Sequence, residues 1–316
     1  MHALILFFIL GLPFLAVCAL VIVAVVIGAP VKRLAVSPDV TDVARAVSRQ
    51  VQVRNLAALA AGITVGAALA ILVSTNSLQV QWLPFVVPTV TAATAILVFA
   101  RMPTVTFREA PGVRTADLER RRPWSAGPRW LFVLTAVSAL VLIVTIVLTG
   151  LSAMPDGRSF GYARGDLSGT GSPYPGFFFG VPALVGLVVL AIAVLVALAR
   201  ITSAARPTSA SLRDVDTVLR QIAVRVVLKA TISAILVTTG GAMFSAGGVL
   251  RNASYTLELN GGGALQPAGL IGTIIIPFGA ILVIAGIVFF VLAVLDAVRR
   301  PIALLPASTS LESSRS

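Results

Sequence analysis

The stretch Trp130–Ala153, WLFVLTAVSALVLIVTIVLTGLSA, decides the fold class. It contains no charged residue, and it is longer than the roughly 20 residues with which an apolar helix crosses the hydrocarbon core of a bilayer. The rest of the chain has the same character. Of its 316 residues 58% are hydrophobic and 11% are charged, and the mean hydropathy is +1.00. A soluble domain usually carries about 25% charged residues, so the composition predicts an integral membrane protein.

Seven apolar runs of this kind predict an all-α protein with seven transmembrane helices. They are Ala3–Gly28, Leu56–Val73, Trp82–Ala100, Leu131–Leu151, Phe177–Ala199, Val226–Val249 and Leu270–Val298. The basic pair Lys32 and Arg33 follows the first run instead of preceding it. A signal peptide has its positive charge before a shorter apolar segment, so we interpret the first run as a retained helix.

The distribution of positive charge predicts the orientation. With the N-terminus outside, all but three of the 24 Lys and Arg residues fall on the cytoplasmic side; the exceptions are Arg158, Arg164 and Arg251. Lys and Arg near the ends of spans resist translocation, which favours an N-out, C-in protein of a bacterial cytoplasmic membrane. Anionic lipid headgroups are the natural counter-charge of such a rim. We therefore attribute the basic composition to topology and coding bias, and expect no nucleic-acid partner.

Two similar octamers indicate an internal duplication. VSRQVQVR at 47–54 and VLRQIAVR at 218–225 each precede an apolar run, with proline-containing segments at matching places around them. Both units begin outside, so they would be parallel repeats related by an axis along the membrane normal. The predicted divisions are a first three-helix repeat (1–105), a loop with linker helix 4 (106–153), an outer loop with the second repeat (154–300), and a disordered cytoplasmic tail (301–316). This 3+1+3 layout is similar to that of the SWEET sugar transporters, without any motif of that family.

The octamers also predict short amphipathic helices that lie at the cytoplasmic interface or extend the next span inward. Val43, Val47 and Val51 follow helical spacing after a start at Ser37–Pro38. Such a helix contacts either a partner protein or lipid headgroups through snorkelling arginines. The candidate contact residues are Arg49, Arg54, Arg220 and Arg225.

Prolines and threonines supply the remaining candidate site. A proline inside a helix frees a carbonyl group, and in a membrane a freed group needs another helix, a water or a cavity to satisfy it. The candidate polar cavity consists of Pro13, Pro88, Thr91, Thr94, Pro182, Thr238, Thr239 and Pro277. Close packing of helices is the alternative, since Gly62 with Gly66 and Gly241 with Ser245 have small-xxx-small spacing.

Ionisable residues are absent from the centres of the predicted spans. Lys229 and Asp296 lie near the cytoplasmic ends of the sixth and seventh spans, where each either pairs with the other or reaches the headgroups; we favour the headgroups. In the outer loops, Pro155–Gly176 and a strand-and-turn signal at Ser254–Leu259 together predict a small cap.

No catalytic signature, cofactor motif or metal-ligand cluster is present in the sequence. Three classes of function remain. The first is a non-catalytic subunit or accessory protein of a membrane complex, indicated by the cytoplasmic arms. The second is a small-solute facilitator or permease, indicated by the repeat and the prolines. The third is a membrane sensor, indicated by the outer loops.

Overall fold

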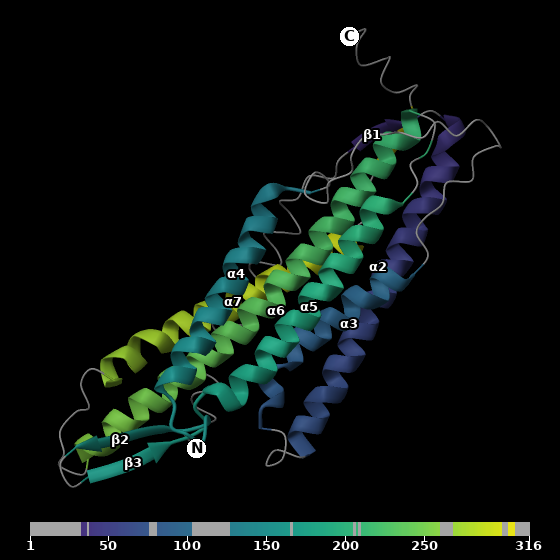
Figure 1. The fold of residues 1–316 in the computed structure, drawn as a ribbon. Coiled ribbons are helices and arrows are strands. Elements are labelled where there is room, and N and C mark those ends of the chain that lie inside the picture. The colour runs from purple at the N-terminus through teal and green to yellow at the C-terminus, as the bar shows by residue number, and fades with distance from the viewer. Residues whose placement is uncertain are drawn as a thin grey trace, which may run out of the picture.

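A computed structural model shows that the chain folds into a bundle of helices. The structure describes residues 33–36, 38–75, 81–102, 127–164, 167–204, 207, 210–259, 268–298 and 303–306. Within these ranges the helices are α2 (Pro38–Thr75), the short 3₁₀ helix η1 (Leu83–Phe85), α3 (Val87–Arg101), α4 (Arg129–Ser152), α5 (Phe177–Ser203), α6 (Ala210–Leu259) and α7 (Ala268–Val298). Figure 1 shows them running along one common direction.

Five of these helices are long and apolar enough to cross a membrane: α2 from Arg49, α4, α5, α6 and α7. The third predicted span divides into η1 and the 15-residue α3, a shorter apolar helix. At 1.5 Å per residue α3 is about 22 Å long, less than the roughly 30 Å of hydrocarbon. The first predicted span, Ala3–Gly28, and with it Pro13, lies outside the described residues. The described part of the chain thus contains five candidate spans and one shorter apolar helix, α3, which is preceded by the single turn η1.

Two small sheets lie at opposite ends of the bundle (Figure 1). At one end β2 (Phe160–Arg164) pairs antiparallel with β3 (Leu167–Gly171). At the other end β1 (Arg33–Val36) pairs parallel with β4 (Ala303–Pro306). Part of the segment predicted to be a disordered tail is therefore a strand, and residues 307–316 lie outside the described residues.

Helix α6 is the centre of the bundle. In the most apolar 18-residue stretch of α6, 67% is buried, compared with 11% in the corresponding stretch of α2. Leu228, Ile232 and Ile235 are almost fully buried, and they share their hydrophobic cluster with side chains of α3, α4 and α5. In a bilayer the exposed apolar faces of the outer helices would meet lipid, so the burial of α6 makes it the helix around which the others pack.

The contact between α6 and α7 is made through small residues at intervals of seven. On α6 these are Ser233, Gly240, Gly247 and Ser254, and on α7 they are Gly272, Gly279, Gly286 and Ala293. A Cβ atom at Gly247 would lie 3.0 Å from the carbonyl oxygen of Gly272, which leaves the two backbones in direct contact. A seven-residue repeat keeps one stripe facing the partner along a supercoiled pair, and small residues permit close approach of membrane helices.

Only half of the predicted small-residue pairs lie at helix contacts. Gly62 and Gly66 face Thr91 and Ala95 of α3, with Cβ positions 2.9 Å from these side chains. A Cβ at Gly241, in contrast, would have nothing within 4 Å. The contact with α7 is made by its neighbour Gly240 and by Gly247, so the predicted helix contact at Gly241 is wrong.

Two further predictions are corrected by the helix boundaries. Ser254–Leu259 is not a strand, because α6 continues to Leu259 with Leu250, Ala253 and Leu257 buried on one helical face. An alternating pattern over six residues fits both structures, and burial against the bundle selects the helix. Pro88 occupies the first turn of α3, where its missing N–H breaks no helical hydrogen bond. It therefore starts a helix and does not kink one.

The outer loop 155–176 forms a cap that is attached to the end of α6. Ser245 donates a hydrogen bond of 2.9 Å to the carbonyl of Pro173, and a Cβ at Gly171 would lie 2.6 Å from Val249. Buried Tyr174 packs with Val249 and Leu250, and its hydroxyl lies 2.7 Å from Ser152 Oγ at the end of α4. The cap thus joins α4, α5 and α6 at this end of the bundle.

Candidate functional site

At the end of the bundle opposite the cap, four helices enclose a hollow lined by three arginines. Its walls come from the start of α6, the octamer part of α2, and the ends of α3 and α5. The lining residues are Val51, Arg54, Phe99, Ala100, Met102, Arg200, Ile201, Ala204, Asp216, Leu219, Arg220 and Ala223. The cavity volume is about 50 Å³, which holds roughly four water molecules.

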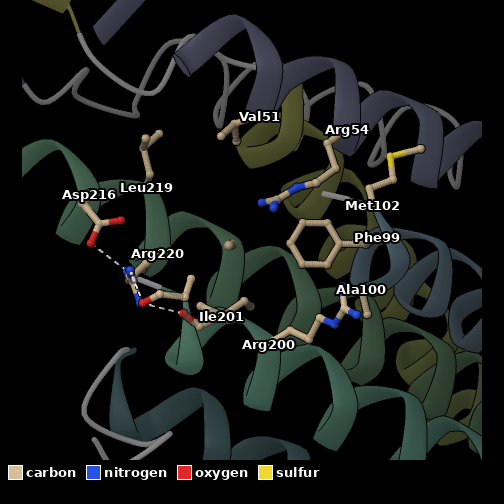
Figure 2. A pocket seen from close by; sticks show the side chains of 12 residues that line it. Val51, Arg54, Phe99, Ala100, Met102, Arg200, Ile201, Asp216, Leu219 and Arg220 are labelled. Carbon is tan, nitrogen blue, oxygen red and sulfur yellow. Dashed lines mark hydrogen bonds and ion pairs between the residues drawn. The ribbon is translucent and has the colours of Figure 1, made fainter. Parts of the chain in front are cut away.

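Helical periodicity explains why Arg54 lies at the edge of this hollow. Val47, Val51 and Ala58 are buried on one face of α2, and Arg54 follows Val51 by three residues on the border of that face. Its guanidinium carbon lies 4.2 Å from the centre of the Phe99 ring. Figure 2 shows the side chain extending over that ring towards Arg220 and Ile201. A cation over an aromatic face is stabilised by about 1 kcal/mol or more when it is partly desolvated.

The Nε atom of Arg54 is buried and has no hydrogen-bond partner among the described residues. A buried donor without a partner costs about 1–3 kcal/mol, and more for a charged group. Asn55, the next residue, uses its side chain elsewhere: its Nδ2 donates to the carbonyl of Ala297 on α7. The Nε–H of Arg54 is therefore a donor whose hydrogen bond is not satisfied within the described residues.

Arg220 has a different, structural role on the opposite wall. Its Nε donates to Asp216 Oδ2 at 2.8 Å, one turn earlier on α6. Its Nη1 and Nη2 donate to the carbonyls of Ile201 and Ala204 at 2.8 and 3.0 Å (Figure 2). These carbonyls belong to the C-terminal end of α5, where no intrahelical donor remains. Arg220 thus caps α5 and holds the start of α6 against it.

Arg200 comes from the last turn of α5 and is exposed. No sequence pattern distinguishes Arg200, Phe99 or Asp216 as a site residue. The charged residues of the lining carry a net charge of +2, since Asp216 offsets one of the three arginines. The hollow is therefore electropositive, with Arg54 and Arg200 as the arginines that do not cap a helix.

The predicted contact arginines occupy two kinds of place. Arg54 and Arg220 line the hollow, whereas Arg49 and Arg225 are exposed on the outer faces of α2 and α6. Neither octamer is a separate surface helix: each is the first part of a long helix that continues into the bundle. Of the two predicted placements, the structure has the inward extension of the next span.

The described residues of the candidate polar cavity are spread over four helices, α3, α5, α6 and α7, and do not line the hollow. Thr94 and Thr239 donate to the carbonyls of Val90 and Ile235 in their own helices. The hydroxyls of Thr91 and Thr238 are buried without a partner among the described residues. Pro182 and Pro277 lie inside α5 and α7, and Pro277 is exposed.

Lys229 and Asp296 form an ion pair between α6 and α7, with 2.6 Å between Nζ and Oδ2. The prediction that each reaches the headgroups independently was therefore wrong. Their side chains are 13% and 28% exposed, so pairing removes two unpaired charges from a partly dry interface.

Comparison with models of protein families, with curated proteins and with solved structures gave no match to this chain.

Proposed function

We propose that this protein is a non-catalytic subunit or accessory protein of a complex in a bacterial cytoplasmic membrane. The observation that carries the proposal is the attachment of both octamer segments to the bundle. Gln52 of α2 donates to the carbonyl of Val298 on α7 at 3.0 Å, and Arg220 of α6 caps α5. Each segment is thus a fixed arm, and we name the two arms by their residues, 46–55 on α2 and 212–225 on α6.

Fixed arms suit the binding of a partner. A surface that is already ordered loses little conformational entropy on association, and both arms keep exposed residues, Arg49 and Val53 on α2 and Arg225 on α6. Since each arm continues into a candidate span, a partner bound to the arms is held at a defined position against the membrane.

The full arrangement belongs to the same proposal: seven spans, N-out and C-in, with two parallel three-helix repeats joined by α4. The contacts between helices support the repeat because they occur in related pairs. Helix α2 packs on α3 as α6 packs on α7, and α2 touches α7 as α6 touches α3. The charges support the orientation, since Arg101, Arg129 and Arg200 lie at the same end as the two arms.

A pull-down of the tagged protein from its native membrane in mild detergent tests the subunit role. Mass spectrometry with stoichiometry should find a partner in near-equal amount. Charge reversal of the exposed arm residues, Arg49→Glu with Arg225→Glu, should reduce recovery of that partner about tenfold or more. The matched control is Arg251→Glu, an exposed arginine at the capped end of α6. Recovery of the protein alone, or equal recovery with both sets of variants, contradicts the proposal.

A small-solute facilitator is the second candidate, favoured by the unpartnered hydroxyls of Thr91 and Thr238. Buried polar atoms without partners are expensive, and a permeating polar solute would supply partners. Uptake of candidate solutes into liposomes that contain the purified protein tests this function. Thr91→Val and Thr238→Val should slow uptake if these hydroxyls serve a solute, whereas Thr94→Val is the control because its hydroxyl bonds within α3. Absence of protein-dependent uptake removes this candidate.

A further inference from the structure

We propose that Arg54 and Arg200 hold a phosphate group in the hollow between α2, α3, α5 and α6. This inference does not depend on the subunit role, because a lipid or an ion is enough to occupy the site. The two sources of such a group are the headgroup of an anionic phospholipid and free inorganic phosphate. Both offer the same tetrahedral oxygens to the guanidinium groups.

The arginines of the hollow differ in how many of their N–H donors are already used. A guanidinium group carries five N–H donors in a planar fork that matches phosphate oxygens. Arg220 directs its fork at Asp216 and at the end of α5. Arg54 leaves a buried Nε–H without a partner among the described residues, and Arg200 lines the same hollow from α5. Two arginines from different helices, α2 and α5, thus line the same small space.

Arg54 is held in place before any ligand binds. Its guanidinium group is stacked on Phe99, a buried residue near the end of α3. The contact with the ring face restricts the orientations open to the guanidinium group. A bound oxyanion would therefore meet a donor that loses little conformational freedom on binding, which favours affinity.

The size and the charge of the hollow both fit a phosphate group. A cavity of about 50 Å³ accepts a group of a few heavy atoms, such as a phosphate. The net charge of +2 on the lining matches the charge of a phosphate monoester or exceeds that of a diester. The hollow also lies at the end of the candidate spans, where the bilayer places its phosphate groups and where basic pockets between helices bind lipid headgroups.

The test uses the purified full chain in neutral detergent micelles and measures the midpoint of thermal unfolding. Three probes are titrated separately: dihexanoylphosphatidylglycerol below its micelle concentration, inorganic phosphate, and potassium chloride at matched ionic strength. A phosphate site should raise the midpoint with one or both phosphate probes and not with chloride. Half-maximal stabilisation at a concentration at least tenfold lower for the lipid assigns the headgroup as the source, and equal concentrations assign the free anion.

Four variants decide whether the hollow is the site. Arg54→Gln and Arg200→Gln should each raise the half-maximal probe concentration about tenfold or more, because each removes charge-assisted hydrogen bonds. Arg101→Gln and Arg129→Gln remove the same charge from exposed arginines at the same end that do not line the hollow, and they should change it less than twofold. Arg200 is exposed, so its variant keeps the test valid if Arg54→Gln fails to fold.

Three outcomes overturn the proposal. The first is stabilisation by chloride equal to that by phosphate, and the second is an equal loss in the exposed-arginine variants, since both indicate a diffuse response to charge. The third is a wild-type protein that responds to no phosphate probe while Arg54→Gln unfolds at a lower temperature. That result would assign Arg54 to a contact within the protein.

Discussion

Gly240 of α6 and Gly279 of α7 lie so close that a Cβ atom on Gly240 would be 2.6 Å from the carbonyl oxygen of Gly279. The reverse substitution is equally crowded, with 2.7 Å to the carbonyl of Gly240. A carbonyl oxygen cannot rotate away as the end of a side chain can. Any side chain at either position must therefore separate the two helix backbones.

We expect Gly240→Ala to destabilise the protein by about 1–3 kcal/mol, the usual cost of an overpacked contact. Gly241→Ala is the matched control, because a Cβ there meets nothing within 4 Å and alanine favours a helix over glycine by about 1 kcal/mol. Thermal unfolding of the two variants in detergent measures the difference. Equal midpoints for both variants would mean that the two helices do not touch at Gly240.

The ion pair between Lys229 and Asp296 predicts strong coupling between two residues that are 67 positions apart. Asp296→Asn leaves the ammonium group of Lys229 without its counter-charge, and should cost about 1–3 kcal/mol, less than a fully buried pair would because both groups keep some exposure. The double variant Lys229→Met with Asp296→Leu should recover much of that loss. Together with the single variants Lys229→Met and Asp296→Leu it forms a double-mutant cycle in thermal unfolding that measures the coupling, and additive effects would contradict the pairing.

Arg220 should contribute more to stability than any exposed arginine of the arms, because its guanidinium group bonds two carbonyls at the end of α5. We expect Arg220→Gln to cost about 2 kcal/mol or more, and Arg220→Lys to recover only part of it, since an ammonium group lacks the planar fork. Arg225→Gln on the outer face should stay within about 0.5 kcal/mol of the wild type. Proteolysis of the connection between α5 and α6 provides a second readout, with faster cleavage expected in Arg220→Gln.

Tyr174 predicts a dependence of stability on alkaline pH. Burial raises the pKa of the Tyr174 hydroxyl above its usual value of 10.0, and the hydrogen bond with Ser152 opposes this shift in part. The unfolded chain therefore loses the proton at a lower pH than the folded one, so stability is fully present below pH 10 and falls as the pH rises above it. Unfolding midpoints from pH 8 to 11 should fall more steeply in wild type than in Tyr174→Phe. Parallel curves would contradict the prediction, and Tyr255→Phe, at an exposed position, is the control.

The sequence predicts the helices of this bundle because each apolar run is long and uninterrupted. The runs at Leu131–Leu151, Phe177–Ala199 and Leu270–Val298 lie within α4, α5 and α7. Composition is enough to predict a helix in such segments, because a run of about 20 apolar residues is typical of a helix that crosses a membrane. The short pattern at Ser254–Leu259 is different, because six alternating residues fit a strand as well as the end of a buried helix.

The hollow was only half predictable, for a geometric reason. The repeated octamers drew attention to Arg54 and Arg220, but nothing local distinguishes these two from Arg49 and Arg225. The difference arises from neighbours far along the chain: Phe99 under Arg54, and the end of α5 under Arg220. The spacing of Gly272, Gly279 and Gly286, in contrast, is visible in the sequence and indicates a helix contact. Three glycines at intervals of seven on an apolar helix predict a flat contact stripe.

Helix α6 runs for 50 residues without a proline, from the arginine-lined hollow to the cap formed by β2 and β3. At 1.5 Å per residue its length is about 75 Å, more than twice the roughly 30 Å of hydrocarbon in a bilayer. The hollow and the cap, although remote from each other in space, are therefore built on one continuous element of secondary structure.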